Sequence, residues 1–151
     1  MMAAMASDLH GTVESRLRAT GLRYTDQRRR LIEILARAGS PVALPDILRG
    51  RRGMAQSSAY RNLADLEQAG VVRRVTVDDE HARYELTEDL TGHHHHLICS
   101  NCGRVQDLPM PADFERTMDR TLDGLARRAG FAEVSHRLDL IGLCRDCAAR
   151  G

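Results

Sequence analysis

The sequence predicts an α+β protein in which a winged helix-turn-helix domain precedes a small α/β domain stapled by zinc. Three observations lead to this prediction. Apolar residues recur at helical spacing to about residue 70, and they alternate with polar residues over about 71–86. All four cysteines fall in two C-x-x-C pairs that bracket the last third of the chain. We place the first domain at residues 1–87, a hinge at 88–92 and the second domain at 93–151.

Four helices are predicted in the first domain, and each has an apolar stripe with recognisable start or stop signals. The first helix spans 8–20 and stops before Gly21, and the second is capped by Thr25 and stops at Gly39-Ser40-Pro41. A short helix at 44–48 follows. The fourth helix is capped by Ser57 or Ser58 and ends at Ala69-Gly70. The residues expected to face inward are Val13 and Leu17, then Leu31, Ile34, Leu35 and Ala38, then Ala59, Leu63 and Leu66. The last three helices stand in the order of a helix-turn-helix.

Strands follow the fourth helix. Residues 71–77 and 82–86 alternate in polarity around the turn Asp78-Asp79-Glu80, which predicts a hairpin that serves as the wing. In the second domain the pattern predicts a strand at 103–108, a helix at about 112–129 and a strand at 133–142. Each domain has few large apolar side chains with which to build a core, because hydrophobic residues make up 42% of the chain and aromatic residues only 3%. Such small domains usually need a metal or a partner subunit.

The charge is distributed unevenly along the chain, and this indicates which partners each half suits. Residues 1–77 hold 13 Arg against 7 acids, a net charge of +6, and residues 78–151 hold 9 Arg against 14 acids, a net charge of −5. A basic first half suits a phosphate backbone, and an acidic half with six of the seven His suits cation binding. Two solvated surfaces of opposite sign remain the alternative. No run approaches the ~18 apolar residues of a membrane span and no apolar signal segment opens the chain, so we expect a cytoplasmic protein without a membrane partner.

The cysteines predict a structural zinc site. Cys99 with Cys102 and Cys144 with Cys147 form two C-x-x-C pairs, a pattern typical of tetrahedral thiolate zinc. Four protein ligands leave no open position for a substrate. The ion would join the two ends of the second domain and replace core that this domain lacks. Redox dithiols or inert buried thiols are the alternative.

Four consecutive histidines, His93 to His96, lie just before Cys99. Side chains alternate between faces in an extended segment, so His93 and His95 would point one way and His94 and His96 the other. One tetrapeptide could therefore serve two metal sites, and a solvated polar loop is the alternative. Further ligands could come from Glu85, Asp107, Glu115, Asp119 and His136.

These motifs resemble the ferric uptake regulator (Fur) family over nearly the whole chain. The matching stretches are Gly21-Leu22-Arg23-Tyr24-Thr25, Ser58-Ala59-Tyr60-Arg61-Asn62-Leu63, Tyr84-Glu85-Leu86-Thr87, HHHHLICSNCG from His93 to Gly103, Val134-Ser135-His136 and Gly142-Leu143-Cys144-Arg145-Asp146-Cys147. The resemblance implies an N-terminal winged helix on a C-terminal dimerisation domain, and it assigns the four cysteines to the structural zinc site. It also implies a sensing site at the hinge and a further site in the dimerisation domain. The sensing ligands would be Glu85, His94, His96 and Asp107, and the additional ligands would be His93, His95, His136 and a helical acid, for which we favour Glu115 over Asp119.

The chain departs from the family at one expected ligand. Many members supply a sensing-site His from the loop after the second helix, where this chain has Ser40-Pro41. His81 is a poor substitute, because four strand residues separate its Cα from that of Glu85 by roughly 13 Å. Oxygen and imidazole ligands accept Zn²⁺, Fe²⁺ or Mn²⁺, with zinc ahead in intrinsic affinity, so the ligand set leaves zinc and iron nearly level as the sensed metal.

The resemblance predicts a metal-responsive repressor that binds palindromic operator DNA as a homodimer when the sensing site is loaded, and that controls genes of metal uptake or homeostasis. Tyr60 and Arg61 are the expected base contacts. The expected phosphate or minor-groove contacts are Ser57, Ser58, Arg23 and Arg28, although each Arg could simply be a solvated charge. The alternatives are a peroxide sensor that uses Fe²⁺-dependent His oxidation and a zinc-stapled dimer that binds proteins. No H-x-E…P-C-x-x-C or H-E-x-x-H motif occurs, so we expect neither an enzyme nor a small-molecule substrate.

Overall fold

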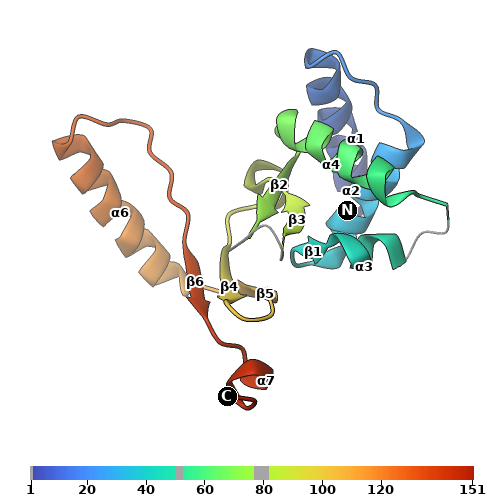
Figure 1. Cartoon of the computed structure of the whole chain (residues 1–151). Coiled ribbons are helices and arrows are strands. Elements are labelled where there is room, and N and C mark those ends of the chain that lie inside the picture. The colour runs from blue at the N-terminus through green and yellow to red at the C-terminus, as the bar shows by residue number, and fades with distance from the viewer. Residues whose placement is uncertain (1, 50–52, 77–81) are drawn as a thin grey trace.

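The computed structural model describes residues 2–49, 53–76 and 82–151, and Figure 1 shows helices gathered around the first half of the chain and one helix standing apart in the second half. The elements in chain order are α1 (Met2–Ala19), α2 (Asp26–Ala38), β1 (Val42–Ala43), α3 (Leu44–Arg49), α4 (Gln56–Gln68), β2 (Val72–Val75), β3 (Arg83–Leu86), α5 (Glu88–Thr91), β4 (His95–Cys99), β5 (Val105–Leu108), α6 (Ala112–Arg128), β6 (Asp139–Gly142) and α7 (Arg145–Ala148). No described helix is long and apolar enough to cross a bilayer. The mixed architecture confirms the predicted fold class.

The first part of the chain forms four helices and a three-stranded sheet in the order β1-β3-β2. Its helices form for the reasons the pattern predicts: Thr25 caps α2 by accepting a hydrogen bond from the Arg28 backbone N–H, and Gly39 ends α2 in a left-handed conformation at φ 66°. One continuous apolar core lies between the helices and the sheet. Its buried residues are Val13, Leu17, Leu31, Ile32, Leu35, Leu44, Ile47, Ala59, Leu63, Leu66, Val71, Val72, Tyr84 and Leu86.

Several local predictions for this part were wrong. The first helix begins at Met2 and not near residue 8, and α4 begins at Gln56 after Ala55, so neither Ser57 nor Ser58 is its N-cap. Ala38 is exposed, while the buried face of α2 includes Ile32. Strand β1 was not predicted, because two residues are too short to show an alternating pattern; it pairs antiparallel with β3. The expected turn at 78–80 and His81 lie outside the described residues.

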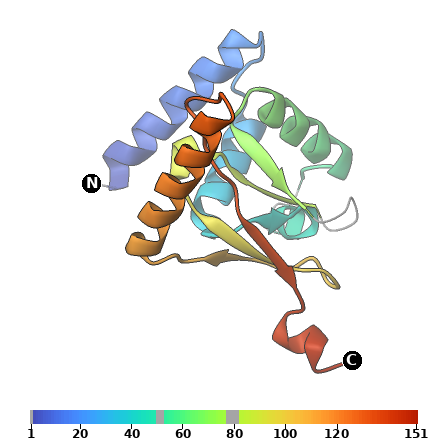
Figure 2. The same cartoon turned by 90° about the vertical axis from the view of Figure 1, so that its left-hand side faces the viewer.

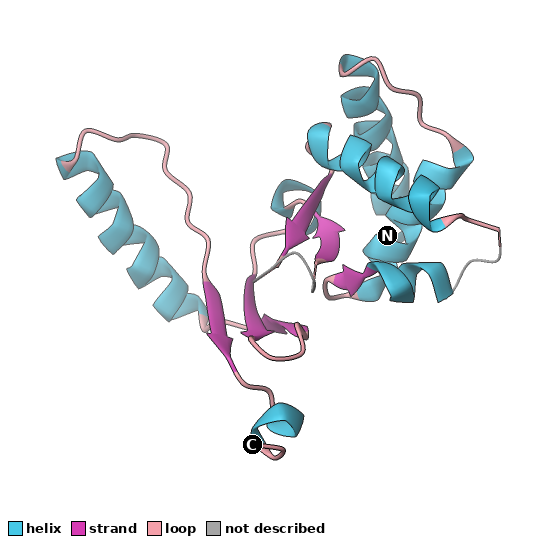
Figure 3. Ribbon diagram, in the orientation of Figure 1, coloured by secondary structure: helices cyan, strands magenta, loops and turns pink. Residues whose placement is uncertain are grey.

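The second part contains a three-stranded sheet in the order β5-β4-β6, with β4 antiparallel to β5 and parallel to β6. Helix α6 connects β5 to β6 and runs beside the returning chain (Figure 2). None of its residues is buried. The strand expected at 133–142 is limited to Asp139–Gly142, and a long loop leads into it from α6 (Figure 3). The expected hinge contains one helical turn, α5.

The two parts meet through the wing. Val75 on β2 packs with Ile98 on β4 and Val105 on β5 in a small apolar cluster. Arg83 Nε on β3 donates a hydrogen bond to the Gly103 carbonyl at 2.7 Å. The wing sheet therefore lies against the second sheet, beside the segment that carries the histidines and the first cysteine pair.

Candidate metal centres

Three clusters of ligand-type side chains occur among the described residues. In each cluster, one potential ligand atom per residue lies within 4.8 Å of the others. The clusters are Cys99, Cys102, Cys144 and Cys147 (the cysteine cluster); Glu85, His94, His96 and Asp107 (the hinge cluster); and His93, His95, Glu115 and His136 (the dimerisation-domain cluster). The structure thus brings together the three sets of residues that the sequence analysis grouped. Whether each set binds an ion depends on its donor chemistry.

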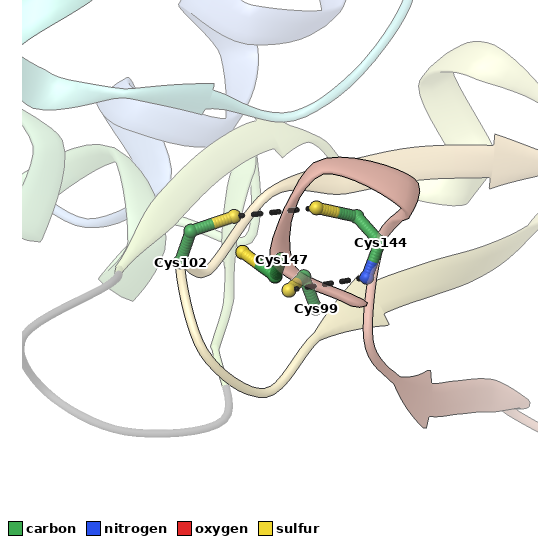
Figure 4. A group of neighbouring side chains, drawn as sticks. All are labelled: Cys99, Cys102, Cys144 and Cys147. Atoms are coloured by element: carbon green, nitrogen blue, oxygen red, sulfur yellow. Dashed lines mark hydrogen bonds between the residues drawn. The ribbon is translucent and has the colours of Figure 1, made fainter. Parts of the chain in front are cut away.

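The cysteine cluster forms where the two ends of the second domain meet (Figure 4). Cys99 ends β4 and Cys102 follows in the turn, while Cys144 precedes α7 and Cys147 lies within it. All four are free thiols. The Sγ atoms of Cys102 and Cys144 are 3.9 Å apart, and tetrahedral zinc with Zn–S bonds of about 2.3 Å places its sulfurs about 3.8 Å apart. The cluster therefore fits zinc.

Backbone and side-chain donors point at these sulfurs. The Cys144 amide donates to Cys99 Sγ at 3.4 Å, and the Asn101 side-chain amide donates to Cys147 Sγ at 3.3 Å. Hydrogen bonds from the backbone N–H groups of Cys144 and Cys102 lower the pKa of the Cys99 thiol to about 6. Metal binds the thiolate, so this environment favours the ligating form of Cys99. At Cys147 the hydrogen bond from Asn101 lowers the pKa, but the neighbouring thiols and burial together raise it to about 11.

The hinge cluster joins both sheets. Glu85 extends from β3 of the wing. His94 lies just before β4 and His96 lies within it, and Asp107 lies on β5 directly opposite His96 in the strand register. The Oε2 atom of Glu85 is 2.9 Å from His94 Nε2 and 3.2 Å from His96 Nε2. Glu85 and His96 are both buried.

The contacts of the two histidines in the hinge cluster direct hydrogen-bond acceptors at its centre. His94 Nδ1 is 2.9 Å from the Gly92 carbonyl, and His96 Nδ1 is 2.9 Å from the Asp139 carboxylate. Both partners only accept hydrogen bonds, so Nδ1 carries the hydrogen and a neutral ring directs its Nε2 lone pair at Glu85. The Oδ1 atom of Asp107 is buried without a hydrogen-bond partner. Acceptors that converge in this way are stabilised by protonated imidazole rings or by a divalent cation. The carboxylate and imidazole groups of the cluster fit such a cation.

The pKa shifts reflect the same convergence. Burial of the Glu85 carboxyl raises its pKa, but hydrogen bonds from His96, His94 and Arg73 outweigh burial and lower the pKa to about 2. Burial lowers the pKa of His94 and His96, but the hydrogen bond of each ring to Glu85, a second hydrogen bond (to Gly92 for His94 and to Asp139 for His96) and the charge of Glu85 together outweigh burial and raise the pKa of both. Without an ion, the cluster therefore favours protons on its histidines.

The dimerisation-domain cluster centres on Glu115 of α6. Its Oε1 atom lies 3.1 Å from His93 Nε2 and 3.0 Å from His136 Nε2, and its Oε2 atom lies 2.9 Å from His95 Nε2. Asp119, one turn further along α6, instead contacts His136 Nδ1 at 3.1 Å. The structure therefore favours Glu115 as the ligand and Asp119 as the group that orients His136. The Nε2 atoms of His93 and His136 are only 3.1 Å apart, as expected of two rings that share a cation.

The loop after α2 borders the hinge cluster without adding an imidazole. Gly39 and Ser40 line a cavity of about 390 Å³ together with Glu85, His94 and Asp107. Pro41, the last residue of this loop, is buried. Without a histidine here, the described residues offer the cluster four ligand-type side chains, all of them oxygen or imidazole donors.

The expected DNA-contacting residues divide into two groups. Tyr60, Arg61 and Ser57 are exposed on the outward face of α4, Ser58 is half-buried at its start, and Arg23 is exposed. The prediction for Arg28 needs correction, because its side chain is buried and its guanidinium binds Asn62 Oδ1, the Arg23 carbonyl and Asp65. Arg28 joins α2 to α4, and each of its three guanidinium nitrogens donates to a group of the protein.

Sequence reasoning missed the residues that orient the ligands. Asp139 holds His96, Glu88 accepts from His93 Nδ1 at 2.8 Å, and Arg73 binds the second carboxylate oxygen of Glu85. Only the strand register reveals Asp139, because the parallel pairing of β6 with β4 places it beside His96. Glu88 lies in the expected hinge, where a charged residue carries no signal of its own.

The chain resembles known regulators along its length. Residues 19–141 match the model of the ferric uptake regulator family. The chain is 30% identical over 149 residues to the peroxide operon regulator of Bacillus subtilis (strain 168), covering 96% of this chain and 97% of that protein. It is 30% identical over 142 residues to the ferric uptake regulation protein of Neisseria gonorrhoeae, covering 91% and 94%. The solved structure of the Helicobacter pylori ferric uptake regulator has the same fold, with a TM-score of 0.72 and 22% identity over 95% of this chain and 93% of that one.

Proposed function

The chain belongs to the ferric uptake regulator family, whose members are metal-dependent transcriptional regulators, and we propose that it represses genes of metal uptake or homeostasis. In this proposal it binds palindromic operator DNA as a homodimer when the hinge cluster holds a divalent ion. The observation that carries the proposal is the meeting of Glu85 with His94, His96 and Asp107, because these ligands come from two different sheets.

The hinge cluster is placed to control the orientation of the winged helix. Glu85 belongs to β3, the central strand of the wing sheet, so its position is fixed to the helix-turn-helix. His96 and Asp107 are cross-strand partners in the second sheet. A dication bound by all four residues would replace the protons on His94 and His96 and tie the two sheets together. The relative orientation of the two winged helices in a dimer sets the spacing of the half-sites that it can bind.

The exposed face of α4 supplies the proposed DNA contacts. Ser57, Tyr60 and Arg61 follow one another at helical spacing on this face, while Ala59, Leu63 and Leu66 point into the core. A guanidinium such as Arg61 can bind a guanine through two hydrogen bonds, and a Tyr ring can pack on a thymine methyl group. Arg23 would contact a phosphate. The net charge of +6 over residues 1–77 favours binding to the backbone of DNA.

The second sheet and α6 present the proposed dimer interface. Strand β6 is at the edge of its sheet, and Leu140 and Ile141 on it are 46% and 59% exposed. Helix α6 exposes further apolar side chains, namely Phe114, Leu122 and Leu125. Exposed apolar side chains in this number on a small domain are typical of surfaces that a second copy covers.

The cysteine cluster would hold a structural Zn²⁺, and the hinge cluster would take Zn²⁺, Fe²⁺ or Mn²⁺. A second candidate function is peroxide sensing, in which oxidation of a His ligand in the iron form releases DNA. The likeness to the Bacillus subtilis peroxide operon regulator and an oxygen-and-imidazole hinge cluster that can take Fe²⁺ favour this candidate.

The proposal is tested by fluorescence anisotropy on AT-rich palindromic DNA with protein that retains only its thiolate zinc. We expect binding to appear on titration with Zn²⁺, Fe²⁺ or Mn²⁺, with the physiological metal acting at the lowest free concentration. Glu85→Gln should abolish the metal response, and Glu33→Gln, which removes a carboxylate on α2 outside the three clusters, should leave it intact. Equal DNA binding with and without added metal would overturn the proposal. Loss of binding after peroxide treatment of the iron form but not of the zinc form would establish the peroxide sensor.

A further inference from the structure

Two charged side chains lie between the hinge cluster and the dimerisation-domain cluster. Arg73 is on β2 and Glu88 is the first residue of α5. Arg73 Nε donates to Glu85 Oε1, Arg73 Nη1 donates to Glu88 Oε1 at 3.0 Å, and His93 Nδ1 donates to Glu88 Oε2 at 2.8 Å. An unbroken line of hydrogen bonds therefore runs from a residue of one cluster to a residue of the other.

Each carboxylate in this line has its two oxygens committed to different tasks. Glu85 gives Oε1 to Arg73 and keeps Oε2 for His94 and His96. Glu88 gives one oxygen to Arg73 and the other to His93. Because Glu88 accepts the Nδ1 hydrogen, the neutral His93 ring directs its Nε2 lone pair at Glu115 and His136. Glu88 thus fixes the ring nitrogen that His93 presents to its cluster.

Burial and register make this line well defined. Arg73 and Glu85 are direct cross-strand partners of β2 and β3, and their side chains are only 18% and 8% exposed. Glu88 is 25% exposed and begins the helical turn that follows β3. Charge-assisted hydrogen bonds between such partly desolvated groups restrict the rotamers of both partners. Moving Glu88 would therefore displace Arg73, and with it the carboxylate plane of Glu85.

We propose that Glu88 is a positioning residue shared by two metal sites: it orients His93 for the dimerisation-domain cluster directly and Glu85 for the hinge cluster through Arg73. This inference rests on the proposed function, because it requires that both clusters bind metal. It adds a residue of the hinge that contacts no ion itself and still sets the affinity of both sites. Partners that orient metal ligands typically change metal affinity 10- to 100-fold.

The test compares Glu88→Gln with Asp89→Asn. Glutamine keeps one carbonyl oxygen, so it can accept from His93 or from Arg73 but not from both as a carboxylate does. Asp89 is the next residue of α5, pairs with Arg16 on α1 and contacts neither cluster, so its substitution removes the same charge at nearly the same place. Any difference between the two variants then reports the hydrogen bonds and not the lost charge.

Each site is measured alone by Co²⁺ titration, followed by visible absorption, in full-length protein that keeps its thiolate zinc. A Glu85→Ala background reports the dimerisation-domain cluster, and a His136→Ala background reports the hinge cluster. We expect Glu88→Gln to weaken Co²⁺ binding about tenfold or more at the dimerisation-domain cluster and about threefold at the hinge cluster, where its action is indirect. Asp89→Asn should leave both affinities within about twofold of those of the background proteins.

A double-mutant cycle tests the route through Arg73. In an Arg73→Gln background, Glu88→Gln should no longer change Co²⁺ affinity at the hinge cluster, while its effect at the dimerisation-domain cluster should persist. Equal effects of Glu88→Gln and Asp89→Asn, or an effect at only one cluster, would overturn the shared role. If the unsubstituted protein, with zinc in its cysteine cluster, binds no Co²⁺, the proposed function itself fails. Unchanged circular dichroism in each variant rules out unfolding as the cause of a lost site.

Discussion

The two halves of this chain are stabilised by different means. The winged helix has a continuous apolar core that reaches from Val13 on α1 to Leu86 on β3. The second domain has almost none: Ile98 and Val105 are joined by Val75, which belongs to the wing, and α6 buries no residue at all. In place of a core, the second domain has two of the three ligand clusters and contributes most of the residues of the third.

The difference shows what replaces hydrophobic burial in a thin domain. Burying one large aliphatic side chain contributes roughly 1.5–3 kcal/mol, so the first domain gains from many such residues. A structural zinc site in a small peptide contributes about 10–16 kcal/mol, comparable to several buried side chains together. Domains built in this second way remain responsive, because occupancy of a site changes their stability. In the proposed function, the first domain is a rigid DNA-binding unit whose position the second domain sets.

The largest expected effect comes from removing the structural zinc of the cysteine cluster. Cys102→Ser should unfold the second domain, residues 93–151, because the zinc joins two segments that 41 residues separate in sequence and no apolar core holds them there. The winged helix should keep its structure. In two-dimensional NMR spectra we expect resonances of residues 93–151 to collapse to random-coil positions and those of α2 and α4 to stay. Chelation of zinc from the unsubstituted protein should give the same pattern.

Ser100→Ala is the matched control for this substitution. Ser100 lies in the same turn, is exposed and donates only to the Gly142 carbonyl, so its loss should leave the turn folded. A Cys102→Ser protein with a native spectrum throughout would show that the second domain does not depend on its zinc. The contrast between the two halves would then lose its physical basis.

The next expected effect is smaller. It comes from making the same substitution, Leu to Ala, in each half. Leu63→Ala in α4 should lower the free energy of unfolding of the winged helix by about 2–5 kcal/mol, because Leu63 is fully buried. Leu140→Ala on β6 removes a side chain that is 46% exposed, so it should change unfolding of the monomer little and weaken self-association instead. Urea denaturation measures the first effect and sedimentation equilibrium the second. An equal loss of unfolding free energy in both variants would contradict the distinction.

Much of the fold was predictable because it follows from local patterns. The apolar stripes around Leu63 and Val13 and the cap at Thr25 determine helices within a few residues of chain. Strand β1 has no such local signal, because its two residues are in extended conformation only through pairing with β3. The expected strand at 133–142 was too long for a related reason: its apolar residues Val134 and Leu138 precede the point where β4 offers a pairing partner.

The candidate sites divide in the same way. Alternation along His93 to His96 was enough to separate two clusters, because an extended backbone directs neighbouring side chains to opposite faces. Residues that act through tertiary contacts could not be found. Arg28 was expected to face DNA, since nothing near it in sequence shows that Asp65 on α4 lies against it. The pairing of Arg73 with Glu88 is hidden for the same reason.

The smallest expected effect concerns the contact between the halves in protein without a hinge ion. The pKa of His94 and His96 is raised above 6.5, so their contribution to the contact is full below pH 6.5 and is lost as the pH rises through their folded values. The pKa of Glu85 is lowered from 4.5 to about 2, so its contribution is present above pH 4.5 and is lost as the pH falls toward 2. Protection of β3 and β4 amides from hydrogen exchange, compared at matched intrinsic exchange rates, should therefore be greatest between pH 4.5 and 6.5. Glu85→Gln should flatten this dependence on pH. A saturating divalent ion should remove the loss of protection above pH 6.5, because it replaces the protons on the two rings. A profile that keeps its maximum in Glu85→Gln would place the titrating contact elsewhere and leave the hinge cluster without a part in joining the two halves.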